Sequence, residues 1–213
     1  MKSALLPLFV LVLSTLSVSA HQPDLVRQNP TFVQNPEVSQ AFYGELKGEP
    51  AYFQITSPTD FTLYVQLTLP DVPGIKKDVS ARITKQGDPS FSVALDGTHY
   101  NWTSFYEEFG GDDYWSGPDF KQDVGPGTYV VEVYRPVYQG KYVFVIGEKE
   151  EFPLDVTLRT LFLLPVLKTD FFQKPPYAVL FSRMGILYLP FIIGTIFLVG
   201  ALTWFMKQKC NQK

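Results

Sequence analysis

The residues between 125 and 148 constrain the fold most, because two runs there alternate aromatic and β-branched side chains. The runs cover Thr128–Tyr134 and Lys141–Ile146, and the short linker between them ends in Gly140. Such a pair of runs is typical of an antiparallel hairpin. Both faces of these runs are fairly apolar, which favours positions near the centre of a sheet. We therefore expect the fold to be built around these two strands.

Further alternating runs upstream indicate an all-β fold. The clearest covers Phe61–Leu69, where every second side chain is apolar. Shorter runs cover Gln40–Leu46, Ala51–Thr56, Val79–Thr84, Phe91–Leu95 and Tyr100–Glu107. We expect the first two of these to form a hairpin and residues 108–123 to be an irregular insertion. Residues 40–149 are predicted to form an antiparallel β-sandwich of jelly-roll or immunoglobulin-like type, with about seven or eight strands.

The two ends of the chain predict a membrane location. Residues 1–20 have a basic start, a short apolar core and small residues before Ala20, as in a cleaved signal peptide. Residues 21–39 are expected to be an extended lead-in. Met184–Met206 contains no charged residue and is long enough to cross ~30 Å of hydrocarbon as a helix. Lysines in the predicted tail, residues 207–213, place it in the cytoplasm. We predict a single-pass cell-membrane protein whose N-terminal domain lies outside.

Charge and cysteine content narrow the classes of partner. All 21 acidic residues precede the predicted span, and the one cysteine, Cys210, follows it. A disulfide-based module is therefore excluded for the outer region. An acidic surface argues against nucleic acid as a partner. The expected partners are the membrane lipid bilayer and an unidentified protein or glycan.

Residues 150–183 form an apolar juxtamembrane segment. Its apolar residues could line a short amphipathic helix that is interrupted at Pro165. Such a helix is expected to lie in the membrane interface or to pack back onto the sandwich. One more strand followed by a linker is an equally open alternative.

Several short motifs resemble the pre-peptidase C-terminal type of β-sandwich domain. They are Phe42-Tyr43-Gly44-Glu45-Leu46, Ala51-Tyr52-Phe53-Gln54-Ile55, Gly125-Pro126-Gly127-Thr128-Tyr129 and Gly140-Lys141-Tyr142. The resemblance spans roughly residues 40–145. It implies a jelly-roll-like accessory domain that binds or spaces rather than catalyses. The chain departs from that pattern because it ends in a predicted membrane span.

The acidic, glycine-spaced stretch around residues 107–123 is the candidate ligand-binding site. The candidate side chains are Glu107, Glu108, Asp112, Asp113, Trp115 and Asp119. Oxygen ligands on a flexible loop suit Ca²⁺, for which Asp112, Asp113 and Asp119 are the candidate metal ligands. Trp115 is the best candidate for an exposed ring that could stack on a glycan. An acidic loop that is simply solvated is the competing interpretation.

The leading hypothesis is a non-enzymatic, membrane-anchored binding or scaffolding module, without catalytic residues and without a cofactor other than possible Ca²⁺. One alternative is a copper-dependent envelope protein that uses His21 and His99. Another is a cargo or secretion-complex subunit that works through its span. Asn101 begins an Asn-Trp-Thr sequon, so it could carry a glycan where the host glycosylates exported proteins.

Overall fold

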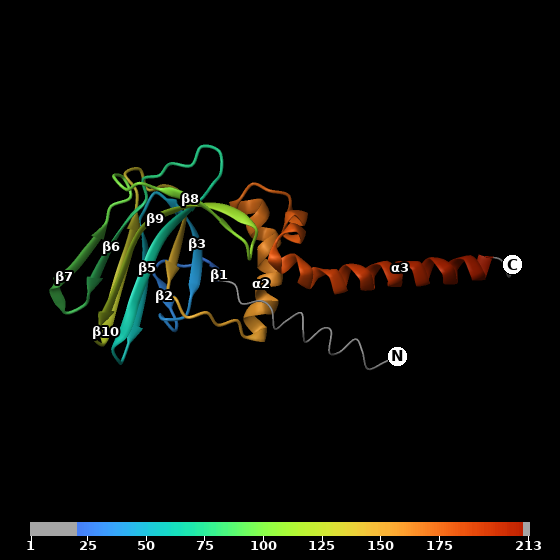
Figure 1. The fold of residues 1–213 in the computed structure, drawn as a ribbon, viewed down its shortest axis with the longest axis horizontal. Helices are drawn as coiled ribbons and strands as arrows, with labels where there is room; N and C mark the ends of the chain where they lie inside the picture. The colour runs from blue at the N-terminus through green and yellow to red at the C-terminus, as the bar shows by residue number, and fades with distance from the viewer. Residues whose placement is uncertain (1–20, 211–213) are drawn as a thin grey trace.

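The computed structural model describes residues 21–210, so the predicted signal peptide, residues 1–20, lies outside the described residues. Within the described range, eleven strands form a sheet of order β1-β3-β11-β5-β9-β8 and a sheet of order β2-β4-β10-β6-β7. The two sheets pack face to face, and the helices gather on one side of them (Figure 1). The prediction of an all-β sandwich with one C-terminal apolar helix is confirmed.

The elements follow one another along the chain as strands first and helices last. The strands are β1 (Gln22–Leu25), β2 (Thr31–Val33), β3 (Gln40–Lys47), β4 (Ala51–Ser57), β5 (Phe61–Pro70), β6 (Ser80–Lys85), β7 (Asp88–Leu95), β8 (Thr103–Glu107), β9 (Asp112–Val124), β10 (Gly127–Tyr134) and β11 (Gln139–Ile146). The helical elements are α2 (Leu154–Val166), the π-helical turn η1 (Leu167–Phe171), the 3₁₀ turns η2 (Pro176–Phe181) and η3 (Arg183–Tyr188), and α3 (Leu189–Cys210). We call residues 154–188, from α2 to η3, the stalk.

The two runs that were expected to form a hairpin lie in different sheets. β10 lies between β4 and β6, whereas β11 lies between β3 and β5. The linker between them therefore crosses from one sheet to the other. Arg135, which is buried in this linker, donates a hydrogen bond from Nη2 to the Lys141 carbonyl oxygen at 2.7 Å. The hairpin prediction is wrong, but the central position predicted for both strands is correct.

β3 and β4 repeat this arrangement, so the hairpin expected for residues 40–56 is also wrong. The residues expected to be an extended lead-in form the edge strands β1 and β2, which pair in parallel with β3 and β4. The sheets are therefore mixed rather than purely antiparallel. Between them, alternate residues of β5 are buried as predicted, and the rings of Phe53 and Phe144 stack with centroids 4.2 Å apart.

The stretch expected to be an irregular insertion is mostly a long strand. β9 pairs with β5 over nearly its whole length, with a shift in register between Gln66 and Thr68. β8 pairs with the start of β9, and the turn between them contains Gly110 and Gly111. Gly111 has a positive φ of 76°, which glycine adopts without strain. We call β8, residues 108–111 and β9 the acidic hairpin.

The outer face of the first sheet is covered by the stalk. Tyr43, Val143 and Val145 on that face pack with stalk residues such as Leu164 and Phe171 in a second apolar cluster. This contact explains why β11 is apolar on both faces. It also shows that residues 150–183 form a helix that packs back onto the sandwich, and not one more strand.

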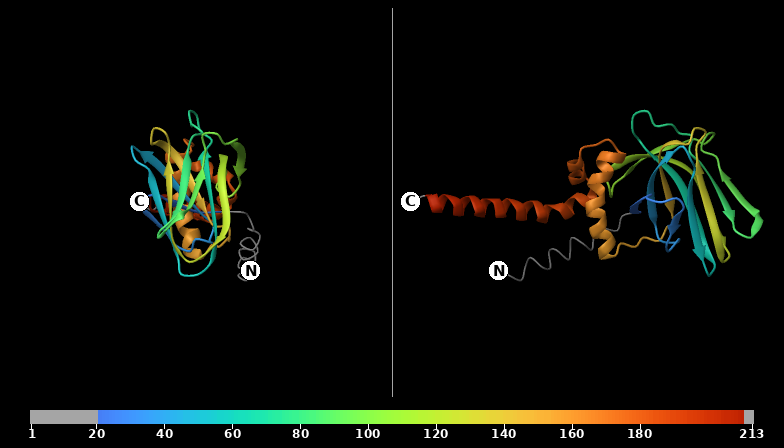
Figure 2. Two further views of the ribbon diagram at one scale, coloured as in Figure 1. Left: turned by 90° about the vertical axis from the view of Figure 1, so that its left-hand side faces the viewer. Right: turned by 180° about the vertical axis from the view of Figure 1, so that it is seen from behind.

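α3 leaves the stalk and points away from the sandwich (Figure 1). The surrounding segment, Arg183–Gln208, is long and apolar enough to cross a membrane, and only 6% of its most apolar window is buried. The right-hand view of Figure 2 shows from behind that α2 lies between the sandwich and α3 and runs across the α3 axis.

Candidate functional site

The acidic hairpin is closed by a carboxylate inside its own turn. Glu107 Oε1 accepts a hydrogen bond from the Phe109 amide at 2.6 Å, and Oε2 accepts one from the Gly110 amide at 2.8 Å. Burial raises the pKa of the Glu107 carboxyl, and these two hydrogen bonds oppose the shift. Glu107 therefore shapes the turn and presents the carbonyl groups of Gly110 and Gly111 to the stalk.

A buried ionic cluster joins this turn to the stalk. Asp112 Oδ2 lies 2.7 Å from Lys168 Nζ, and Asp112 Oδ1 lies 3.0 Å from Lys174 Nζ. The side chains of Asp112 and Lys168 are only 2% and 1% exposed. Lys168 Nζ also donates to the carbonyl oxygens of Gly110 at 2.6 Å and Gly111 at 3.0 Å, so its three protons have three acceptors.

The cluster satisfies the condition under which charges can be buried. Burial lowers the pKa of Lys168, while the hydrogen bond to Asp112 and its charge oppose that shift. A buried ammonium that is paired and fully hydrogen-bonded avoids most of the cost of an isolated buried charge. The Lys168–Asp112–Lys174 cluster therefore fixes how the stalk docks on the acidic hairpin.

The same turn also holds the chain just before α3. The amides of Arg183 and Met184 donate to the carbonyl oxygens of Glu108 at 3.0 Å and Phe109 at 3.2 Å. The side chain of Arg183 forms an ion pair with that of Glu108. Contacts with the acidic hairpin thus run along the stalk as far as η3, which directly precedes α3.

The structure does not gather the predicted metal ligands around one point. Asp112 faces two lysines, Asp113 is exposed with its carboxylate 3.6 Å from Lys174 Nζ, and Asp119 is exposed in register with Gln66. Among the described residues, no group of three or more His, Cys, Asp or Glu side chains could hold a metal ion. The geometry gives the calcium site no support, and calcium binding stays a prediction.

Trp115 is not the exposed ring that the sequence suggested. Its ring packs partly against the sandwich core, its Nε1 donates to Asp71 at 3.0 Å, and Lys77 Nζ lies 2.9 Å from the ring centroid. Asn101 is exposed in the loop before β8, and its glycosylation stays a prediction.

The two histidines lie in different surroundings. His21 Nδ1 is 2.5 Å from Ser39 Oγ, and burial lowers its pKa to about 4. His99 is exposed, with Nδ1 2.7 Å from Asp96 Oδ2. The structure therefore offers the copper alternative no shared pair of ligands among the described residues.

Sequence reasoning missed the lysines of the ionic cluster. A signal for Lys168 was present, because it directly follows the uncharged apolar run Leu161–Leu167. A lysine that becomes buried together with such a run needs a buried partner. The sequence does not indicate which carboxylate that partner is.

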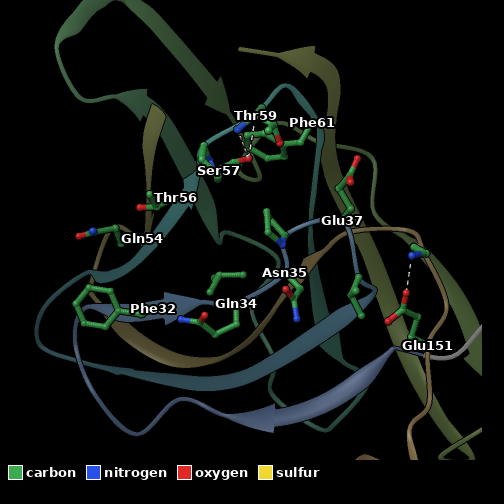
Figure 3. Close-up of a pocket in the computed structure, with 15 residues that line it drawn as sticks. Phe32, Gln34, Asn35, Glu37, Gln54, Thr56, Ser57, Thr59, Phe61 and Glu151 are labelled. Atoms are coloured by element: carbon green, nitrogen blue, oxygen red, sulfur yellow. Dashed lines mark hydrogen bonds and ion pairs between the residues drawn. The ribbon is translucent and has the colours of Figure 1, made fainter. Parts of the chain in front are cut away.

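A second candidate site is an open hollow of about 570 Å³ at the β2–β4 edge of the sandwich. In Figure 3, Phe32, Gln54 and Thr56 lie on one side of it, and Gln34 and Asn35 lie between them and Glu37. The ring of Phe32 is 52% exposed. The lining thus combines one accessible aromatic ring with amide, hydroxyl and carboxylate groups.

The loop that forms this hollow is held in place partly by the side-chain amide of Gln40. Its Nε2, which has two protons to donate, lies within hydrogen-bonding distance of the carbonyl oxygens of Gln34 at 2.9 Å, Asn35 at 3.1 Å and Val38 at 3.1 Å. Glu37 Oε1 accepts a hydrogen bond from the Thr62 amide at 3.2 Å. The polar groups of the loop are therefore positioned before any ligand arrives.

Comparisons with known proteins give only weak structural resemblances. No family model matches the chain, and no curated protein matches it. Among solved structures, the pre-peptidase C-terminal domain of a collagenase from Bacillus anthracis aligns with a TM-score of 0.36 and 13% identity, over 57% of this chain and 97% of that domain. A ruminal GH26 endo-β-1,4-mannanase aligns with a TM-score of 0.26 and 20% identity, over 52% of this chain and 20% of that one. A β-glucosidase from Paenibacillus barengoltzii aligns with a TM-score of 0.24 and 9% identity, over 58% and 13%. The chain therefore has a weak resemblance to a pre-peptidase C-terminal domain, the class that its sequence motifs resemble.

Proposed function

We propose that this chain is a membrane-anchored, non-enzymatic binding module, with its β-sandwich held in a fixed orientation on the outer side of the membrane. The observation that carries the proposal is the docking of the stalk on the acidic hairpin through the Lys168–Asp112–Lys174 cluster. The lysine-rich tail supports the orientation, and the apolar α3 supports the anchoring.

The docked stalk makes the anchor rigid. A flexible tether would let the sandwich turn freely, whereas here buried contacts continue from η1 to η3. Met184, the last residue of the hairpin contact, lies five positions before the first residue of α3, Leu189. A sandwich attached in this way presents the same surfaces outward at all times.

The ligand surface is assigned to the hollow at the β2–β4 edge, not to the acidic hairpin. Asp112 and Glu107 are already engaged in contacts within the chain. The hollow is open and polar, and it offers the ring of Phe32 beside the amide of Gln54. Sugars bind to such surfaces, because their apolar faces stack on rings while their hydroxyl groups bond to amides. We propose a saccharide as the ligand.

The test is a thermal melt of the full chain in lipid nanodiscs with a panel of oligosaccharides. Ligand at ~100 times its Kd adds about 2.7 kcal/mol to the free energy of unfolding, which raises Tm by several degrees. Phe32→Ala should abolish the rise. Tyr52→Ala is the matched control, because Tyr52 is an exposed ring on the adjacent strand β4 that does not line the hollow. A panel without any shift, or equal loss in both variants, would refute saccharide binding at this place.

A further inference from the structure

The stalk helix α2 has an apolar stripe on the side that does not touch the sandwich. The stripe consists of Leu154, Leu158, Phe162 and Val166, which are spaced by four residues and therefore lie along one side of the helix. Leu154 is 74% exposed and Phe162 is 81% exposed. Contiguous exposed apolar surface of this kind marks an interaction site.

The opposite side of α2 packs against the sandwich and the rest of the stalk. Leu161 and Leu164 belong to the buried apolar cluster over the first sheet. Arg159 Nη1 lies 3.1 Å from Asp24 Oδ2 on β1, so the polar flank of the helix is also tied to the sandwich. Because the inner side is fixed by these contacts, the stripe must face away from the sandwich.

The side of α2 opposite the sandwich is the side on which α3 leaves. Figures 1 and 2 show α2 lying across the start of α3, with the sandwich on its other side. The hydroxyl of Tyr188 donates to the carbonyl oxygen of Leu161 in the middle of α2. Tyr188 directly precedes Leu189, the first residue of α3. The middle of α2 therefore lies at the same level along the α3 axis as the N-terminal end of α3.

The length of α3 sets that level relative to a bilayer. Its 22 residues span about 33 Å at a rise of 1.5 Å each, which matches a hydrocarbon core of ~30 Å. With α3 across the membrane, Tyr188 lies at the outer interface, where tyrosine is enriched. A helix that crosses the α3 axis at this level lies in the plane of the interface.

We infer that α2 is an interfacial helix whose stripe dips into the outer leaflet, so that the chain contacts the bilayer through a second surface besides α3. Phe181 on η2 is also 81% exposed. The occupant is lipid, because a bilayer spanned by α3 would lie on the side of α2 that faces away from the sandwich. The inference depends on α3 spanning a membrane, and it is independent of saccharide binding in the hollow.

The test places a fluorescent label on the stripe of the full chain in lipid nanodiscs. Phe162→Cys is labelled in a Cys210→Ser background, since the chain has one native cysteine. Ser90→Cys is the control, because Ser90 is exposed on β7, at the end of the sandwich away from α2 (Figure 1). The nanodiscs contain phosphatidylcholine with a nitroxide quencher on the acyl chain near the headgroup.

The expected result is loss of most of the fluorescence at position 162 and none at position 90. Because Phe162 is exposed, the label does not disturb the core. Equal fluorescence at both positions in the presence of quencher would overturn the inference. Spin labels at position 162 provide a second readout. Strong dipolar coupling between two copies, without quenching by lipid, would show that a second copy covers the stripe. That result would also overturn the inference.

Discussion

Replacement of Asp112 by alanine should release the stalk from the acidic hairpin. The variant leaves the Lys168 ammonium, which is 1% exposed, with two carbonyl oxygens and without its paired carboxylate. Removing one partner of a buried ion pair typically costs about 3–5 kcal/mol, because the other charge stays buried and uncompensated. At 1.4 kcal/mol per factor of ten, the undocked fraction rises by about 10²-fold or more.

Amide hydrogen exchange in lipid nanodiscs measures this undocking directly. The amides of Arg183 and Met184 are protected only while they donate to Glu108 and Phe109, so their exchange should accelerate by the same factor. Asp113→Ala is the matched control, since it removes the same charge from the next residue. Asp113 is 55% exposed and 3.6 Å from Lys174, so its loss should cost about 0–1 kcal/mol.

A double variant tests whether docking requires the ion pair itself or only well-packed side chains at these two positions. Asp112→Leu with Lys168→Met replaces the pair by apolar groups of similar volume, which is often close to neutral. It should recover part of the protection that Asp112→Ala loses, because the carbonyl oxygens of Gly110 and Gly111 still lose their donor. Equal exchange in Asp112→Ala and Asp113→Ala would refute the role of the cluster in docking.

Two further predictions concern packing and pH. Gly44→Ala should lower stability by about 1–3 kcal/mol in a urea titration, since its Cβ would lie 2.4 Å from Cζ of the buried Tyr142 ring. Gly125→Ala should be nearly neutral in the same titration, because its Cβ would lie 3.8 Å from the nearest atom, Lys85 Nζ. His21 has its pKa lowered by burial from 6.5 to about 4, so the unfolded chain binds more protons in that range, and stability should be fully present above pH 6.5 and fall as the pH is lowered toward 4. His21→Asn should flatten the dependence of Tm on pH in this window, and an unchanged slope would contradict the assignment.

The strands could be predicted because their cause is local. The alternation of Phe61–Leu69 reflects one buried and one open face, and it appears directly in the sequence. The pairing of strands is different, because it depends on which sheet each strand joins. Local spacing favoured a hairpin between β10 and β11, but apolar surface on both faces of each strand is satisfied equally well in two separate sheets.

The sequence drew attention to the acidic stretch, but it did not predict that Asp112 pairs with Lys168. An acidic turn with glycines is compatible with a solvated loop, a cation site or a buried ion pair. The choice depends on Lys168, which is 56 positions away from Asp112 in sequence. Only the packing of the stalk on the outer face of the first sheet brings these two residues together.

The cover that the stalk provides over β11 has a consequence for how the protein is made. The sandwich strands end at Ile146, so the chain can complete both sheets before residues 154–188 have been synthesised. Until the stalk docks, Val143 and Val145 face solvent, and apolar surface that is exposed in this way promotes aggregation. Docking of the stalk is therefore a late step of folding, and a protease that cut between Gly147 and Pro153 would release a sandwich with an uncovered apolar face.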